Sequence, residues 1–251
     1  MSPPEASDIP CDSSELRAAS EGETWKEVFL NEKEAGGCSS TAISVMLGHS
    51  ILVLESLATD SECDSLCHEA IAFARTDKCE SFSSRGRARV PLVEFLSEPG
   101  QAVCDQILQR ALKDCIPEII EPLSVALFGK GIVDSIPSEG IIHNPRLEFS
   151  EGEPAINVYS SEGEFKPHKD KESLTLLLNL SGEDEYSGGG TAFYSLADLK
   201  SSEYKIRPTV TTAVRPPKGV AVIFAGSVMH AGLPVLSGNR CVFVGSFSPK
   251  R

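Results

Sequence analysis

The sequence has no apolar run of the roughly 18 residues that a bilayer-spanning helix needs. Its first residues, MSPPEASDIPCDSSE, lack the basic and apolar segments of a secretory signal and the arginines of a transit peptide. We therefore expect an intracellular protein, located in the cytoplasm. Basic side chains are also in the minority, since 23 Lys and Arg oppose 36 Asp and Glu, a formal net charge of −13. Because such a field repels phosphate and anionic lipid, we expect neither nucleic acid nor a membrane surface as a partner.

No Cys-x-x-C pair occurs, although the chain has eight cysteines. A disulfide framework is typical of short secreted chains, whereas 251 residues can bury a sizeable core of their own. We interpret most of the cysteines as reduced, buried small side chains. Cys63, Cys67 and His68 fall within about one helical turn and could hold zinc, but no second pair at ligand spacing accompanies them. A role in the core is therefore favoured.

The chain divides into an N-terminal arm and one folded domain. Residues 1–45 are rich in Ser, Glu, Pro and Gly, which predicts a disordered or loosely packed arm. The domain is expected over residues 46–251, beginning with a strand at 51–54. Helical support is expected over about 59–128, where Thr59 and Glu62 form a capping box, Pro99 begins a second helix, and a third helix follows at 118–128.

After Gly140, short β-prone runs alternate with turn residues. Strands are expected at 141–143, 155–159, 174–180, 191–194, 210–214, 220–224 and 241–247. Such a series predicts an antiparallel double-sheet barrel with the helices packed outside it, an α+β fold. Gly188, Gly189 and Gly190 predict a hairpin turn where backbones approach closely, because no Lys-Ser/Thr follows as in a phosphate-binding loop.

Three residues from two distant parts of the sequence could hold a metal ion. His168 and Asp170 form an H-x-D motif, and residues two apart on an extended segment point to the same side. The motif is short, and a surface pair at a strand end is the alternative. His230 follows the apolar run 220–224 and is therefore expected at the mouth of the barrel.

Arg240 opens the apolar strand 241–247, ten residues after His230. A guanidinium there needs a partner, because burying it alone is costly, and its planar fork fits a carboxylate. The alternative is an exposed arginine at a strand end. Two His and one carboxylate leave three positions open on Fe(II), which suits a bidentate keto acid plus O₂. A keto acid with a second carboxylate for Arg240 is 2-oxoglutarate.

The surrounding residues support this interpretation through a resemblance to a known family. The matching stretches are Asn157-Val158-Tyr159 with Gly163, Phe165, Pro167, His168 and Asp170; Leu174 to Leu180 with Gly188 to Phe193; and Pro217, Gly219, Phe224, His230, Gly232, Pro234, Val235, Gly238, Arg240 and Ser246-Phe247. In these positions the chain resembles the Fe(II)/2-oxoglutarate dioxygenases, in particular their prolyl 4-hydroxylase-like branch. The resemblance implies a double-stranded β-helix, or jelly-roll, barrel flanked by N-terminal helices.

The resemblance also implies roles for individual residues. His168, Asp170 and His230 would ligate iron, and Arg240 would pair with the far carboxylate of 2-oxoglutarate. Tyr159 matches a tyrosine that lines the co-substrate pocket, and Thr175 and Asn179 share a strand face that should look into the barrel. Asn179 stands where some relatives carry an aromatic hydroxyl for the same carboxylate.

The sequence thus predicts a hydroxylase that uses Fe(II), 2-oxoglutarate and O₂, with ascorbate as a reductant. The substrate is a protein or a small molecule; the resemblance favours a prolyl residue, and a free amino acid is the alternative. A catalytically silent jelly-roll binding module and a zinc-dependent hydrolase are the rival functions. His143, Arg146 and Glu148 could contact substrate or form a structural ion pair, and the basic island of Arg85, Arg87 and Arg89 is interpreted as a solvated loop.

Overall fold

The computed structural model describes residues 25–76, 78–79, 83–84, 86–116, 140–195 and 210–250. Its strands are β1 Trp25–Phe29, β2 Ser50–Leu54, β3 Ser83–Ser84, β4 Arg87–Pro91, β5 Leu147–Phe149, β6 Ala155–Tyr159, β7 Phe165–His168, β8 Leu174–Asn179, β9 Tyr186–Gly188, β10 Thr191–Tyr194, β11 Thr212–Val214, β12 Ala221–Ala225, β13 Met229–Gly232, β14 Val235–Gly238 and β15 Arg240–Pro249. Its helices are α1 Glu32–Ala35, α2 Thr41–Met46, α3 Asp60–Ala74, α4 Leu92–Phe95 and α5 Glu98–Gln109, and α5 continues as a π-helical stretch, Arg110–Cys115.

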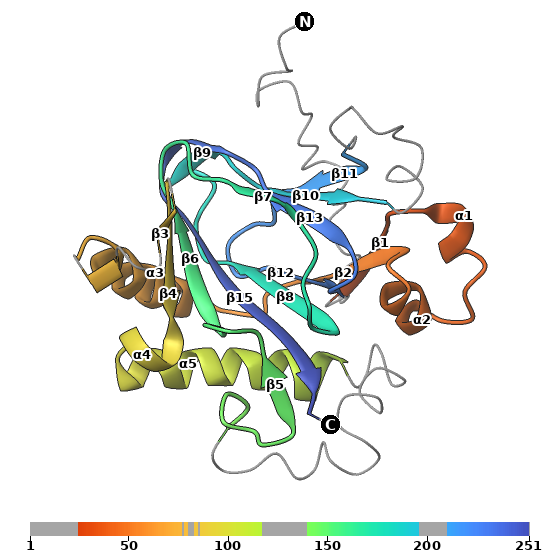
Figure 1. Ribbon diagram of the computed structural model, residues 1–251, viewed down its shortest axis with the longest axis horizontal. Coiled ribbons are helices and arrows are strands. Elements are labelled where there is room, and N and C mark those ends of the chain that lie inside the picture. Colours follow the sequence, from red (N-terminus) through yellow and green to blue (C-terminus); the bar gives the residue numbers. More distant parts are fainter. Residues whose placement is uncertain are drawn as a thin grey trace, which may run out of the picture.

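Two antiparallel sheets form the body of the molecule (Figure 1). The larger has the strand order β1-β2-β12-β8-β15-β6-β4-β3, with β5 paired to β15. The smaller has the order β11-β10-β13-β7, and β14 and β9 form a separate ladder. Strands that are neighbours in space are distant in sequence, as in a jelly roll. The predicted α+β fold, a double-stranded β-helix flanked by N-terminal helices, is confirmed.

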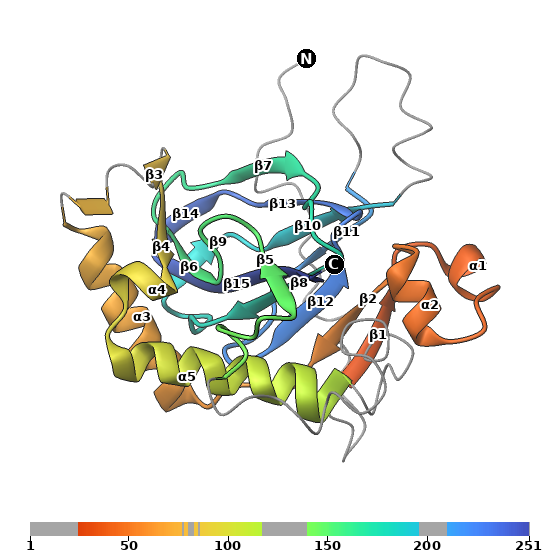
Figure 2. The ribbon, with the colours of Figure 1, turned by 60° about the horizontal axis from the view of Figure 1, so that its bottom comes forward.

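The two faces of the larger sheet carry different side chains, because successive residues of a strand point to opposite faces. On the outer face, apolar residues such as Ile156 of β6 and Phe243 of β15 pack in one core with α3 and α5. Figure 2 shows these two helices beneath the sheet. On the inner face, Asn157 and Tyr159 of β6 lie beside Val242 and Arg240 of β15 and line a cavity. The polar side chains with which the described part of this sheet lines the cavity therefore lie on its inner face.

The helices begin where the sequence predicts. Thr59 Oγ1 accepts the Glu62 N–H at 3.3 Å, and the Glu62 carboxylate accepts the Thr59 N–H at 2.8 Å, so the capping box at the start of α3 is complete. Ser97 caps α5, with Pro99 in its first turn. The expected helix over 118–128 lies outside the described residues.

The folded part begins earlier than the expected boundary at residue 46. Strand β1 pairs with β2 along its whole length, Trp25 opposite Leu54, and α2 buries Ala42 and Val45. Residues 25–45 are therefore packed against the domain, and the expectation of a loose arm over them is wrong. Composition misled here because the packing comes from pairing with a distant strand. Residues 1–24 lie outside the described part of the chain.

The strand expected at 141–143 is also absent, and the segment is a turn. The N–H groups of Ile141 and Ile142 both donate to Asp105 Oδ1 of α5, at 2.6 and 2.9 Å. This contact with a distant carboxylate fixes the backbone and overrides the β propensity of the two isoleucines.

The cysteines behave as core residues. Within the described ranges they form no disulfide, and Cys63, Cys104 and Cys241 are fully buried. Burial raises the pKa of the Cys63 thiol to about 12, so it stays neutral. His68 is exposed on α3 while Cys63 and Cys67 face the core, which does not support a zinc site there. None of the described helices is long and apolar enough to cross a membrane.

Candidate active site

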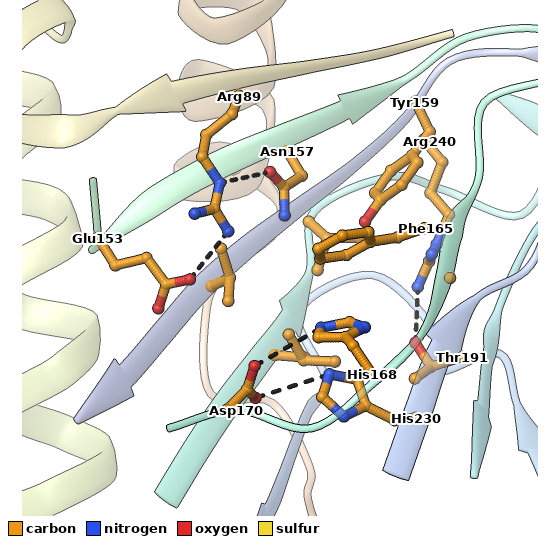
Figure 3. A pocket seen from close by; sticks show the side chains of 14 residues that line it. Arg89, Glu153, Asn157, Tyr159, Phe165, His168, Asp170, Thr191, His230 and Arg240 are labelled. Atoms are coloured by element: carbon orange, nitrogen blue, oxygen red, sulfur yellow. Dashed lines mark hydrogen bonds and ion pairs between the residues drawn. The ribbon is translucent and has the colours of Figure 1, made fainter. Parts of the chain in front are cut away.

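Two strands of the smaller sheet bring the predicted histidines together (Figure 3). His168 of β7 and His230 of β13 are register partners, with ring centroids 4.2 Å apart. Asp170 places Oδ1 3.6 Å from His168 Nε2 and Oδ2 3.6 Å from His230 Nε2. The three ligand atoms lie within 4.8 Å of one another, and no other such group occurs among the described residues. One ion can therefore touch all three side chains.

Both imidazoles are held in the tautomer that a metal ligand needs. His168 Nδ1 lies 2.8 Å from the carbonyl oxygen of Lys166, and His230 Nδ1 lies 3.1 Å from that of Val228. Because a carbonyl only accepts, each Nδ1 carries the proton and each Nε2 directs a lone pair towards Asp170. Burial, opposed by Asp170, lowers the pKa of His230 to about 4, so this ring is neutral at pH 7. Two lone pairs and a carboxylate facing one point fit a cation.

The carboxylate of Asp170 is oriented by two neighbours. The backbone N–H of Asp170 donates to the carbonyl of Gly226 at 2.9 Å, and the hydroxyl of Thr175 donates to Asp170 Oδ2. A Cβ at Gly226 would lie 2.0 Å from the carbonyl oxygen of Glu172, so the two loops meet this closely only because residue 226 is glycine. Thr175, expected to bind the co-substrate, is fully buried behind Asp170 and is not part of the cavity lining.

Arg240 lies at the other end of the same cavity and is 2% exposed. Its Nη1 donates to the Gly190 carbonyl at 3.0 Å and its Nη2 to Thr191 Oγ1 at 3.2 Å, while its buried Nε has no hydrogen-bond partner. No carboxylate of the described residues lies within ion-pair distance of it. A buried guanidinium without a counter-charge is costly, so this end of the cavity fits a carboxylate. The predicted alternative, an exposed arginine, is wrong.

The three-glycine turn makes room for this arginine. Gly188, Gly189 and Gly190 have φ of 69°, 69° and 114°, a region that side chains other than glycine rarely adopt. A Cβ at Gly189 would approach Arg240 Cδ to 3.1 Å. The close-approach hairpin turn predicted for these residues is therefore present, and its function is to admit the Arg240 side chain.

The other two residues assigned to the co-substrate differ in position. Tyr159 lies opposite Arg240 in the ladder between β6 and β15, lines the cavity, and has its ring 5.6 Å from the guanidinium carbon. Asn179 does not line the cavity. Its Nδ2 donates to the carbonyls of Ser181 and Pro216, at 2.9 and 2.7 Å, so its amide is engaged in joining loops.

The cavity has a polar side that sequence reasoning missed. Arg89 of β4 places Nη2 2.9 Å from Glu153 Oε1 and Nε 3.3 Å from Asn157 Oδ1, and all three residues line the cavity. Glu153 also accepts the Ser246 N–H at 2.6 Å. Burial, opposed by Arg89, raises the pKa of the Glu153 carboxyl. The interpretation of Arg89 as part of a solvated loop is wrong, whereas Arg85 lies outside the described residues.

The alternation in Arg87-Ala88-Arg89-Val90 was the available signal, since it is typical of a strand with one polar and one apolar face. In contrast, His143, Arg146 and Glu148 are exposed and do not line the cavity. They give no support to a substrate-contacting role.

Comparison with known proteins agrees with this geometry. Residues 154–248 match the model of the 2OG-Fe(II) oxygenase superfamily. No curated protein matches the sequence. The fold is similar to a prolyl-4-hydroxylase from Pseudomonas putida, with 15% identity, a TM-score of 0.50, and 84% of this chain and 98% of that chain covered.

Two further solved structures are similar. HygX from Streptomyces hygroscopicus, with nickel, 2-oxoglutarate and hygromycin B bound, has 12% identity and a TM-score of 0.51, covering 85% of this chain and 88% of that one. A viral collagen prolyl hydroxylase from Paramecium bursaria Chlorella virus-1 has 15% identity and a TM-score of 0.47, covering 93% and 100%. At these identities the Pseudomonas putida enzyme and HygX show the fold alone.

A jelly-roll barrel with a His-Asp-His triad at one end of its cavity is the architecture of a 2OG-Fe(II) oxygenase. The match to the model of this superfamily covers residues 154–248, the barrel region that carries the three side chains. This superfamily implies Fe(II) as the metal cofactor and 2-oxoglutarate and O₂ as co-substrates.

Proposed function

We propose that the protein is an Fe(II)- and 2-oxoglutarate-dependent oxygenase that hydroxylates an unactivated C–H bond. The observation that carries the proposal is the pairing of two features in one cavity. Three metal-ligating side chains converge at one end, and a buried arginine without a carboxylate partner lies at the other. A silent binding module would have no use for either feature, and a zinc hydrolase would leave Arg240 without a role.

The donor set fits ferrous iron. His168, Asp170 and His230 would hold the ion on one face and leave the other face open for two oxygens of a keto acid and for O₂. When bound, the iron with 2-oxoglutarate and O₂ supplies the oxidation of the substrate carbon, while 2-oxoglutarate leaves as succinate and CO₂. Ascorbate is proposed as a reductant that keeps the iron ferrous.

The chain itself orients the reactants. Arg240 would receive the far carboxylate of 2-oxoglutarate, and Thr191 and the Gly190 carbonyl hold the guanidinium in place. Tyr159 would limit the pocket on the β6 side. Phe165, whose ring lies 4.0 Å from that of His168, would screen the metal ligands from water, since it stands between the cavity and the surface.

A prolyl residue of a polypeptide is our proposed substrate. An open groove of about 880 Å³ meets the cavity at Phe165 and is lined by Arg87, Glu162, Lys166 and Leu236, among others. Leu236 is 54% exposed. A groove of this size outside a narrow cavity suits a chain that lies on the surface and inserts one side chain. Support also comes from the prolyl-4-hydroxylase resemblance, whereas HygX, with hygromycin B bound, represents the small-molecule alternative.

The proposal is tested by adding Fe(II) and 2-oxoglutarate to the protein without oxygen. We expect the weak visible charge-transfer band of the chelate, and in air succinate should form from 2-oxoglutarate. Proline-containing peptides should raise succinate formation and gain the mass of one oxygen. Absence of the band and of succinate would contradict the proposal and favour the binding module.

A further inference from the structure

One polar group in the cavity has no task in the proposed chemistry of iron and 2-oxoglutarate. Asn157 is 3% exposed and lies in β6 between the apolar residues Ile156 and Val158. Its Oδ1 is fixed by Arg89 Nε, which can only donate, so the amide orientation is determined. The Nδ2 group donates to none of the described residues, and Figure 3 shows it directed into the cavity. The N–H pair has no acceptor among the described residues and faces the cavity, so it is available to a ligand.

Arg89 fixes the orientation of this donor. Its Nη2 is held by Glu153 and its Nε by Asn157 Oδ1. With both anchors in place the guanidinium is fixed, and it holds the Asn157 amide with its Nδ2 towards the cavity. This donor defines a position for a hydrogen-bond acceptor of the ligand.

The position of this donor separates it from the proposed co-substrate pocket. In the larger sheet, Asn157 pairs with Arg89 on one side and Val242 on the other. Tyr159 and Arg240 form the next inward-facing row, about 7 Å away along the strands. Figure 3 shows the two groups on opposite sides of the cavity, with the His-Asp-His triad below both. A molecule that contacts Asn157 can therefore approach the metal from the side away from Arg240.

Charge decides which acceptor fits. Glu153 already neutralises Arg89, and it is anchored a second time by the Ser246 N–H. A carboxylate brought to this side would add a second negative charge next to Glu153 without a free cation to balance it. A neutral carbonyl would satisfy the Asn157 donor without that cost.

We propose that Asn157 is a specificity-determining residue that binds an uncharged carbonyl of the substrate, an amide or peptide carbonyl next to the carbon to be oxidised, and that Arg89 positions its amide. This rests on the proposed oxygenase function and adds that free carboxylate-bearing amino acids are poor substrates. The floor between the two rows is apolar, formed by Leu177, Val242 and Val244, and would receive the hydrocarbon part of the same group.

The experiment uses two probes that differ only in charge, N-acetylprolinamide and N-acetylproline. Each is titrated into the anaerobic complex of the full-length protein with Fe(II) and 2-oxoglutarate, and the shift of the visible band is followed. We expect the amide to shift the band and to bind at least about tenfold more tightly than the carboxylate. In Asn157→Asp, the acceptor for Arg89 is retained and the free donor becomes an acceptor, so amide binding should weaken about tenfold.

A second variant and a control complete the design. Arg89→Met should also lose amide binding, while Arg110→Met removes an arginine with the same 2.9 Å contact to a glutamate, Glu62, outside the cavity and should change nothing. In all three variants the affinity for 2-oxoglutarate should change less than about twofold.

Three results would overturn the proposal while leaving the oxygenase function intact. In the first, the unaltered protein binds both probes equally or binds neither. In the second, amide binding is unchanged in Asn157→Asp and Arg89→Met. In the third, these variants bind 2-oxoglutarate more weakly, which would assign the altered residues to the co-substrate. Failure of the unaltered protein to form the band would instead contradict the oxygenase function itself.

Discussion

Two arginines on the inner face of the larger sheet line the same cavity in opposite electrostatic states. Arg240 is 2% exposed and bonded only to neutral oxygens, of Gly190 and Thr191. Arg89 is paired with Glu153 at 2.9 Å. They occupy adjacent rows of one sheet, and they differ in burial, since the Arg89 side chain is 21% exposed, as well as in their partners. An uncompensated buried charge calls for an anion, and a compensated one does not.

The proposed metal site lies between the Arg240 side and the Arg89 side of the cavity, and its removal should have the largest effect. His230→Ala removes a proposed metal ligand that is 5% exposed and whose Nε2 faces Asp170. We expect no visible band with Fe(II) and 2-oxoglutarate and no succinate formation, because the two remaining side chains hold only part of the coordination sphere. Exposed His143 provides the control, and His143→Ala should keep both signals. A band of unchanged intensity in His230→Ala would refute the assignment.

Arg240→Met should separate the two arginines in binding. Loss of the guanidinium removes the charge-assisted pair with the far carboxylate, which should weaken 2-oxoglutarate affinity about 100-fold, or about 3 kcal/mol. Iron binding should persist, because no metal ligand is altered. Isothermal titration with Fe(II) and then with 2-oxoglutarate measures both. Iron loss with unchanged co-substrate affinity would show that the roles are wrong.

The same two arginines should also differ in stability, with opposite signs. Arg89→Met leaves Glu153 buried without its cation and should lower the free energy of unfolding by about 3 kcal/mol. Arg240→Met removes a buried charge that lacks a counter-charge, so without co-substrate it should be neutral or stabilising. Urea unfolding of both proteins in the absence of 2-oxoglutarate tests this. Equal destabilisation would mean that Arg240 is compensated as well.

Of the two arginines, only the role of Arg240 could be predicted from the sequence. Arg240 opens an otherwise apolar strand, and His168 and Asp170 are two residues apart, so both signals are local. Arg89 lies among alternating arginines that resemble a solvated segment, and its partners Asn157 and Glu153 come from distant positions. Its pairing with them depends on the ladder between β4 and β6, which no local pattern reveals.

The role of Thr175 shows the same limit. Its strand and its inward-facing side were predicted, but its contact was not, because the loop that carries Asp170 folds back over β8. Asn179, on the same strand, was assigned to the co-substrate by position, and instead it donates to two backbone carbonyls. The alternation of side chains along a strand predicts which face a residue lies on, but the tertiary fold determines what that residue contacts.

Thr175→Val should reveal what this hydroxyl does for the metal side of the cavity. Valine keeps the shape and removes the donor to Asp170 Oδ2, so the carboxylate loses an orienting bond. We expect iron affinity to fall about tenfold, at the lower end of what such supporting contacts contribute, with 2-oxoglutarate affinity at saturating iron unchanged. Competition with a metal chelator measures the first quantity. A selective loss of 2-oxoglutarate affinity would restore Thr175 to the co-substrate pocket.

The smallest effect concerns the carboxylate that sets Arg89 apart. Burial raises the pKa of Glu153, so between the ordinary carboxyl value and this raised value the folded protein binds more protons than the unfolded chain. Its contribution to stability therefore falls as the pH rises through that window. Glu62 is the matched opposite, because hydrogen bonds from Arg110 and Thr59, although opposed by burial, lower its pKa, and its contribution is lost as the pH falls.

Urea midpoints of Glu153→Gln and Glu62→Gln, each compared with the unaltered protein from pH 4 to 7, should therefore show pH slopes of opposite sign. The advantage of the unaltered protein over Glu153→Gln should shrink towards neutral pH, while its advantage over Glu62→Gln should grow. Slopes of the same sign would mean that Arg89 outweighs burial at Glu153. The cavity would then hold an ionised pair of Arg89 and Glu153 throughout the neutral range, which would strengthen the argument for a neutral substrate carbonyl.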